Sequence, residues 1–475
     1  MVREQRSAND RENWARRCNI GLFWVLVTLV CVLPLPYGSA RVWAWSTFEI
    51  VTALLSLVTL ALVLSDRLNL PDTLRPARGV LGVMAALLLW QGLQLVPMPP
   101  SLIALISPHT ALGQSSNWTT LSQERFATQT HWGLTFAYAQ LFLLVLILVN
   151  SRVRITQFIV ALTVIGATQA SYGTFIANSH LAFDYLFFKE VQQGIATGSY
   201  VNRNHLAGFL GMTLCLGIGL MVGSMKADSG SLNSRRETTR RLLRSLFSRR
   251  YLLRILLLVS VIGLVMTRSR MGNVAFFASL SIGICIWFYL IRHHKRNALI
   301  LFGSLLLVDL WVVGNFFGME RVVDRLQNTT LEGEQRDEVI IDSLTVIADF
   351  PIFGTGAGSF YAIFPTYQNP KISLYYDHAH NDYAQFAVEL GLPGLALLAA
   401  FVLPALWAGL SAVRLRRSML MKGLGLGASM GIMAMLIHAT TDFNLRIPAN
   451  AALFMVVLAF AWISRYGLTD RPTPE

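Results

Sequence analysis

The chain has 475 residues, of which 54% are hydrophobic and only 14% are charged. Its apolar runs are long enough to cross a bilayer core of about 30 Å, and they lack the alternation of barrel strands. The sequence therefore predicts an all-α integral membrane protein. The formal net charge of +13 sits largely in basic runs beside apolar segments, which favours contact with membrane lipids over binding of nucleic acid.

Hydropathy predicts about twelve transmembrane helices in chain order. They lie near 19–35, 43–64, 79–96, 134–150, 155–175, 204–223, 254–267, 272–291, 297–317, 393–412, 423–438 and 447–464.

The orientation follows from the cations, which prefer cytoplasmic loops. Arg3, Arg6 and Arg11 precede the first span, and further basic loops alternate with the spans. Both termini are therefore expected in the cytoplasm. The first span is followed by Gly38-Ser39-Ala40, which resembles a signal-peptide cleavage site, but the later spans favour an uncleaved anchor.

We expect four segments. They are helices one to five with their external loops (1–193), helices six to nine with a basic cytoplasmic loop at 224–254 (194–317), a large external loop carrying the site (318–392), and helices ten to twelve with a cytoplasmic tail (393–475).

The large external loop holds the main candidate site. Helix-like stretches at 320–327 and 336–350 come first, the second with an apolar face of Val339, Ile340, Leu344, Ile347 and Phe350 that predicts a helix along the membrane surface. A glycine-rich turn at 351–360 follows, and its backbone amides could approach a ligand. The polar cluster at 375–383 then combines Asp377, His378, His380, Asn381 and Asp382.

Arginines on the external side run against the usual charge bias. Arg268 and Arg270 occupy a short hairpin tip, Arg446 lies between the last two spans, and Arg203 begins the sixth span. Snorkelling or an ion pair, for instance Arg446 with Asp442, would explain any single one. Several arginines beside histidines indicate a multiply charged anion, because guanidinium groups match phosphate oxygens.

The histidines allow two other interpretations. His378 and His380 could ligate zinc if His205 and His438 supplied further ligands. They could also simply cap loop turns. The four cysteines have no metal or disulfide spacing and are expected to be packing residues.

These motifs together resemble the bacterial O-antigen ligase and O-antigen or exopolysaccharide polymerase superfamily, over about 195–465. The resemblance rests on the tip Thr267-Arg268-Ser269-Arg270-Met271-Gly272, the run 349–358, the cluster 378–383 followed by 389–394, and the last hairpin with His438 and Asp442-Phe443.

The resemblance implies a lipid-dependent glycosyltransferase fold of type C in the bacterial inner membrane, with a periplasmic active site. The implied donor is a glycan on undecaprenyl pyrophosphate, the acceptor a sugar hydroxyl, and no metal or other cofactor is required. His380, Arg270 and Arg336 match the family's catalytic positions.

The residues fit this chemistry. The arginines would stabilise the charge that develops on the leaving pyrophosphate, and His380 would accept the acceptor proton, with Asp377 or Asp382 orienting its ring. Further candidates for substrate binding are Arg203, Arg268, Asp377, His378, Asn381, Asp382, Tyr376 and Arg446. Interfacial tyrosines such as Tyr375, Tyr376 and Tyr383 can equally anchor headgroups.

Four functions remain open. We favour a polysaccharide polymerase, although the motifs do not separate it from an O-antigen ligase that transfers glycan to lipid A core. A protein O-oligosaccharyltransferase would use another acceptor. A polysaccharide or lipid transporter is disfavoured because the sequence has no evident inverted repeat, and its polar groups gather at one surface.

Overall fold

The computed structural model describes residues 2–112, 118–224, 249–291, 303, 331–370 and 372–468. Within these ranges, ten helices are long and apolar enough to cross a membrane, and a shorter apolar helix covers Tyr251–Met266. The prediction of an all-α membrane protein is confirmed. The predicted span at 297–317, apart from Gly303, and the predicted loop helix at 320–327 lie outside the described residues.

The first half of the chain consists of long helices joined by short connecting elements. Its elements are α1 (Val2–Val32), η1 (Tyr37–Ser39), α2 (Val42–Leu64), α3 (Leu74–Leu93), α4 (Pro100–Ile106), α5 (Pro108–Leu112), α6 (Arg125–Leu148), α7 (Arg152–Ala177), β1 (Phe183–Asp184), β2 (Lys189–Glu190) and α8 (Arg203–Gly223). The two strands pair antiparallel.

In the second half, the segment predicted to be a large external loop lies between long helices. Its elements are α10 (Arg249–Met266), α11 (Arg270–Leu290), α14 (Leu331–Asp349), α15 (Phe360–Ile363), η2 (Phe364–Thr366), α16 (Asp382–Leu415), α17 (Met419–His438), η3 (Asn444–Arg446) and α18 (Pro448–Tyr466). Helix α16 bends at Gly391, where φ is 70°.

Three helices form the centre of the bundle. The most apolar stretches of α8, α18 and α17 are 100%, 89% and 72% buried, whereas those of α2 and α3 are only 28% buried. Glycines let α8 and α17 approach closely, because a Cβ at Gly219 or Gly427 would collide with the backbone of the other helix. The backbones of α8 and α17 are therefore in direct contact at these two positions.

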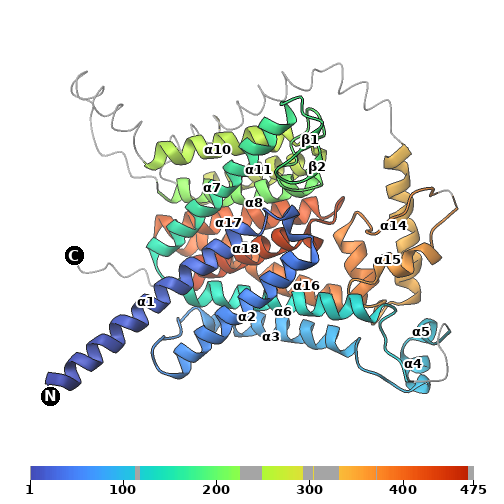
Figure 1. Ribbon diagram of the computed structural model, residues 1–475, viewed down its shortest axis with the longest axis horizontal. Coiled ribbons are helices and arrows are strands. Elements are labelled where there is room, and N and C mark those ends of the chain that lie inside the picture. The colour runs from blue at the N-terminus through green and yellow to red at the C-terminus, as the bar shows by residue number, and fades with distance from the viewer. Residues whose placement is uncertain are drawn as a thin grey trace.

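The short elements that the sequence predicts to be external lie toward one end of the bundle. In Figure 1 the strands, α4, α5, α14 and α15 lie toward one end, while the N-terminus of α1 lies toward the opposite end. A small second core holds α14 in place, with Val339, Val346 and Phe350 packed against Phe360 and Phe364.

The predicted apolar face of α14 is partly wrong. Val339 and Phe350 are buried as expected, but Leu344 is 57% exposed and Val346 takes its place in the core. The helix packs on neighbouring external elements and along α16. The burial of its apolar face therefore does not require the membrane surface.

Candidate active site

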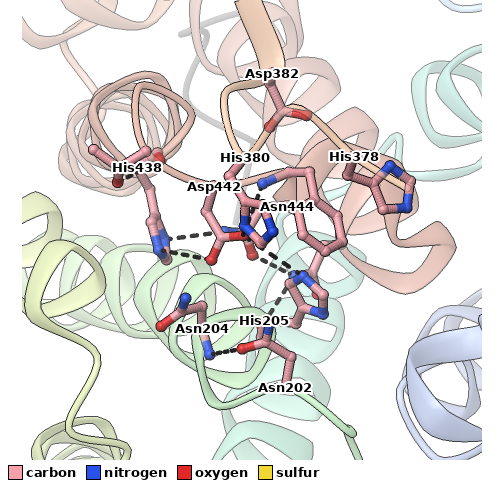
Figure 2. A network of polar contacts seen from close by, with 12 residues as sticks. Asn202, Asn204, His205, His378, His380, Asp382, His438, Asp442 and Asn444 are labelled. Carbon is pink, nitrogen blue, oxygen red and sulfur yellow. Dashed lines mark hydrogen bonds and ion pairs between the residues drawn. The ribbon is translucent and has the colours of Figure 1, made fainter. Parts of the chain in front are cut away.

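Four side chains meet where the central helices end, on the side that the sequence predicts to be external. The carboxylate of Asp442, in the link between α17 and α18, lies 3.9 Å from His205 Nε2, 4.0 Å from His380 Nδ1 and 3.9 Å from His438 Nε2. These imidazoles come from the start of α8, from the segment before α16 and from the end of α17. Figure 2 shows them turned toward Asp442. We call these four residues the imidazole cluster.

A second layer of amides fixes one member of the cluster. Asn444 Nδ2 lies 3.3 Å from His438 Nδ1, and Asn450 Nδ2 donates to Asn444 Oδ1 at 2.9 Å. Since the Asn444 amide donates to Nδ1, the proton of a neutral His438 ring is on Nε2 and faces the Asp442 carboxylate. Tyr200 completes the chain by donating to Asn450 Oδ1 at 3.0 Å.

One aromatic ring organises the histidines. Phe443 stacks on His378 with ring centroids 4.1 Å apart, and it meets His205 and His380 edge to face at 4.8 Å and 4.9 Å. Phe443 thus separates His378 from the imidazole cluster and limits how far each ring can turn.

His380 has a strained backbone and a neutral ring. Its φ is +50°, in the left-handed region that non-glycine residues seldom adopt. Burial, the positive charge of Arg336 and the neighbouring His378 ring lower the pKa of His380 to about 3. The ring is therefore an unprotonated proton acceptor at neutral pH.

Asp442 is a buried carboxylate whose charge is partly compensated. Burial raises its pKa to about 6, while the Phe443 amide, Arg336 and Asn204 act in the opposite direction. Arg336, on α14, thus acts electrostatically on both His380 and Asp442. The structure therefore brings two of the three predicted catalytic residues, Arg336 and His380, to one place.

Arg270 lies two residues before a glycine that packs against the imidazole cluster. It begins α11, whose first turn is capped by Ser269 accepting from the Gly272 amide at 3.2 Å. A Cβ on Gly272 would lie 3.2 Å from His438 Cε1, so this turn packs directly on the imidazole cluster. The Arg270 side chain itself is exposed.

Arg268 points elsewhere. Its guanidinium Nη2 lies 3.0 Å from the position of a Cβ on Gly194, so it packs on the external segment after α7.

Arg203 begins α8, and Asn202 caps that helix by accepting from Asn204 N at 2.8 Å. The segment before it is held by Lys189, whose ammonium donates to Thr197 Oγ1 at 2.8 Å and to the carbonyls of Gly198 and Tyr200. Arg203 and His205 therefore start from a fixed backbone.

His378 and Asp377 lie outside the imidazole cluster. His378 Nδ1 pairs with the Gln385 amide at 2.9 Å, and its Nε2 is 4.0 Å from Asp377. The Asp377 side chain is 67% exposed. Asp377 therefore faces His378, and among the described residues it is Asp442 whose carboxylate approaches His380 to 4.0 Å, a role that the sequence motifs did not indicate.

Asn381 and Asp382 join helices. Asn381 Oδ1 caps α16 at the Ala384 amide, and its Nδ2 donates to Thr440 O at 3.0 Å. Asp382 Oδ2 accepts from Leu445 N at 3.1 Å. Both residues tie the start of α16 to the α17–α18 link.

Tyr376 lies next to His380, the candidate general base. Its side chain is buried and meets the His380 ring edge to face at 5.8 Å. Tyr376 thus differs from Tyr375, whose side chain is 67% exposed.

Arg446 forms a buried ion pair with Glu389 of α16, and its guanidinium also lies 4.5 Å from the centre of the Phe386 ring. The alternative pairing of Arg446 with Asp442 is therefore wrong. Glu389 additionally accepts from Gln385 Nε2 at 3.0 Å and from the amide of Gly358 at 2.6 Å. The pair thus connects α16, η3 and the glycine-rich turn.

The glycine-rich turn does not offer its amides to a ligand. The N–H groups of Thr355, Gly356, Ala357 and Gly358 donate to Val388 O, Glu389 O, Gln94 Oε1 and Glu389 Oε2. A Cβ on Gly358 would collide with His131. The expectation that this turn approaches a ligand is wrong, because its glycines serve close packing.

The His-x-His pair does not converge on a common ligand, since His378 turns to Gln385 and His380 to Asp442. His205 and His438 do approach His380, as the zinc alternative required. Among the described residues, however, no group of three or more His, Cys, Asp or Glu side chains has a geometry that could hold a metal ion.

Comparison with protein families gives one match. A family model described as O-antigen ligase matches residues 255–399, a range that contains Arg270, Arg336 and His380. No curated protein matches the chain. The match supports the resemblance to the O-antigen ligase and polymerase superfamily, and with it a multi-pass membrane protein with glycosyltransferase-like activity.

Proposed function

We propose that this chain, part of which matches the O-antigen ligase family model, is an inner-membrane enzyme of the O-antigen ligase and polymerase superfamily that transfers a glycan from undecaprenyl pyrophosphate to an acceptor sugar hydroxyl at the periplasmic face. The observation that carries this proposal is the His380 ring, whose Nδ1 lies 4.0 Å from the buried carboxylate of Asp442, at a place where the charge of Arg336 acts on both groups. Of the acceptors, we favour a second lipid-linked repeat, which makes the enzyme a polymerase.

In the proposed reaction the acceptor hydroxyl oxygen attacks the anomeric carbon of the donor. The bond from that carbon to the pyrophosphate oxygen breaks, and the lipid pyrophosphate leaves with both electrons of the bond. Arg336 and Arg270 stabilise its developing charge. Between the described residues, neither arginine forms an ion pair with a carboxylate.

His380 accepts the hydroxyl proton. With its Nδ1–H directed at Asp442, 4.0 Å away, Nε2 is the basic nitrogen. Distances near 4 Å exceed a hydrogen bond, but catalytic pairs commonly tighten when substrate binds. The positive charge of Arg336 lowers the pKa of His380. The donor pyrophosphate would offset this charge, so the pKa of His380 would rise on donor binding and the ring would become a stronger base.

The function can be tested with purified protein and an undecaprenyl-pyrophosphate oligosaccharide, with and without lipid A core. A ladder of longer glycans without added acceptor supports the polymerase, and product only with core supports the ligase. Product only on a protein hydroxyl supports the oligosaccharyltransferase. Absence of transfer under all conditions contradicts the proposal, and loss of transfer upon chelation contradicts its independence from metals.

Replacing Arg336 by glutamine should lower kcat/KM by about 10²–10³-fold, because one preorganised cationic donor is lost. The acid limb of the pH–rate profile should also move to higher pH, since Arg336 lowers the pKa of both His380 and Asp442. Arg268→Gln is the matched control, because Arg268 packs near Gly194. A limb that moves equally in both variants would argue against the assigned role of Arg336.

Protonation of Asp442 should produce the acid limb of the pH dependence of kcat/KM. Its pKa is raised to about 6, so the carboxylate is lost and kcat/KM should fall as the pH drops through about 6. In Asp442→Asn this limb should disappear, and the plateau should be roughly 10- to 100-fold lower, because a charge-assisted interaction of about 1.5–3 kcal/mol is lost. An unchanged limb in the variant would exclude Asp442 as its source.

A further inference from the structure

The hairpin between α7 and α8 carries three large, exposed apolar side chains. Strands β1 and β2 are joined by residues 185–188, which we call the hairpin tip. Within it, Tyr185, Leu186 and Phe188 are 73%, 66% and 75% exposed. Neighbouring exposed side chains of this size and type mark a candidate contact surface.

A buried carboxylate holds the hairpin tip in place. Asp184 is only 1% exposed, and its Oδ1 accepts from the Tyr172 hydroxyl at 2.6 Å and from the amides of Leu186 and Phe187 at 3.1 Å and 3.2 Å. The Phe187 ring packs edge to face on Tyr172, with centroids 5.3 Å apart. The outward direction of the neighbouring side chains is therefore part of a bonded structure.

Phe188 has an uncommon backbone conformation. Its φ is +44°, in the left-handed region that bulky residues seldom adopt. Because the residue is 75% exposed, contacts within the chain bury little of its ring. The turn therefore keeps a large aromatic side chain directed away from the protein.

The exposed face of α7 leads toward the hairpin. Val153, Val160, Val164 and Phe175 recur at helical spacing and are 64%, 38%, 44% and 69% exposed. Since α7 is long and apolar enough to cross a membrane, this face suits contact with lipid chains. Phe175 lies in the last turn of α7, close in the chain to Tyr172, which holds the hairpin tip.

The hairpin tip also contacts the turn before α2. The hydroxyl of Tyr37, in η1, donates to Phe187 O, and the Arg41 guanidinium lies 5.2 Å from the centre of the Tyr37 ring. Val42 and Trp43, which begin α2, are 65% and 64% exposed. The tip is thus attached near the ends of two helices that could cross a membrane, α2 and α7, and such ends lie where hydrocarbon gives way to headgroups.

We propose that the hairpin tip contacts the bilayer on the predicted external side, with Tyr185, Leu186 and Phe188 at the boundary between headgroups and acyl chains. Aromatic side chains favour this boundary, where a tyrosine keeps its hydroxyl in water while its ring is in contact with lipid. The exposed guanidinium of Arg41 suits the phosphates of the same lipids. A second copy of the chain is the competing occupant. The contact does not depend on the proposed glycan transfer.

The test places a nitroxide spin label on the full chain in nanodiscs of phosphatidylethanolamine and phosphatidylglycerol. Leu186→Cys carries the label after Cys18, Cys31 and Cys285 are replaced by alanine, whereas Cys215 is buried and stays. Collisions of the label with oxygen, which dissolves in the bilayer, are compared with collisions with a water-soluble nickel complex.

The oxygen-to-nickel ratio should be several-fold higher at Leu186→Cys than at Asp337→Cys, because the acyl region concentrates oxygen and excludes the nickel complex. Asp337→Cys is the matched control, since Asp337 is exposed and charged on α14. Tyr185→Cys should give the same high ratio, and it replaces Leu186→Cys if that variant does not fold.

Two results would overturn the proposal. Equal ratios at the hairpin tip and at Asp337→Cys would place the tip in water. Broadening between labels at the tip that disappears when excess unlabelled protein is mixed in before reconstitution would show a second copy there instead of lipid. Because the labels are measured without substrate, either answer is obtained whether or not transfer is found.

Discussion

His380→Ala is expected to lower transfer by about 10²–10⁴-fold, the contribution of a positioned general base. The reason is that His380 is the neutral imidazole next to Asp442 and under the influence of Arg336. The rate should be measured with donor at saturation, together with a melting temperature in detergent to show that the fold is retained.

His378→Ala is the matched control, because His378 lies on the other face of Phe443 and pairs with Gln385. We expect it to change KM for the glycan more than kcat. If His378→Ala abolished transfer and His380→Ala did not, the roles of the two histidines would have to be exchanged.

Arg446→Met is expected to destabilise the protein by about 3–5 kcal/mol, because it leaves the Glu389 carboxylate buried without its cation. The loss should appear as a lower melting temperature or a lower denaturant midpoint in detergent. Arg446 would then be mainly a structural residue, in contrast to the substrate-binding role that its external position suggested.

The double variant Glu389→Gln with Arg446→Met separates these roles. It removes both charges while the introduced glutamine keeps an acceptor oxygen, so the double variant should be more stable than Arg446→Met alone. An Arg446→Met protein with unchanged stability and weakened donor binding would instead support the substrate-binding role.

Much of the architecture could be predicted, because hydropathy reports directly on the lipid environment. The long apolar helices that the structure describes overlap the predicted spans, and the imidazole cluster lies at the ends of two of these helices and in the segments next to them. The α14 face was less predictable, since external elements such as Phe360 and Phe364 decide which of its residues are buried.

The site was only partly predictable, because its geometry depends on contacts between distant segments. His380 and Arg336 could be found from their motifs. The placement of Asp442 beside His380, and of Phe443 among three imidazoles, could not, since these contacts join segments that lie far apart in the chain. The signal that was available is the presence of His438 and Asp442 in one short external hairpin, together with His205 at the start of a span.

The glycine contacts between α8 and α17 have a consequence for redesign. Because neither helix can gain even a methyl group at these positions without shifting the other, natural or laboratory diversification for new sugars has little freedom in the bundle core. Adaptation to other glycans should accumulate in exposed residues outside it, such as Tyr375 and Tyr361, while the helix ends beneath stay unaltered.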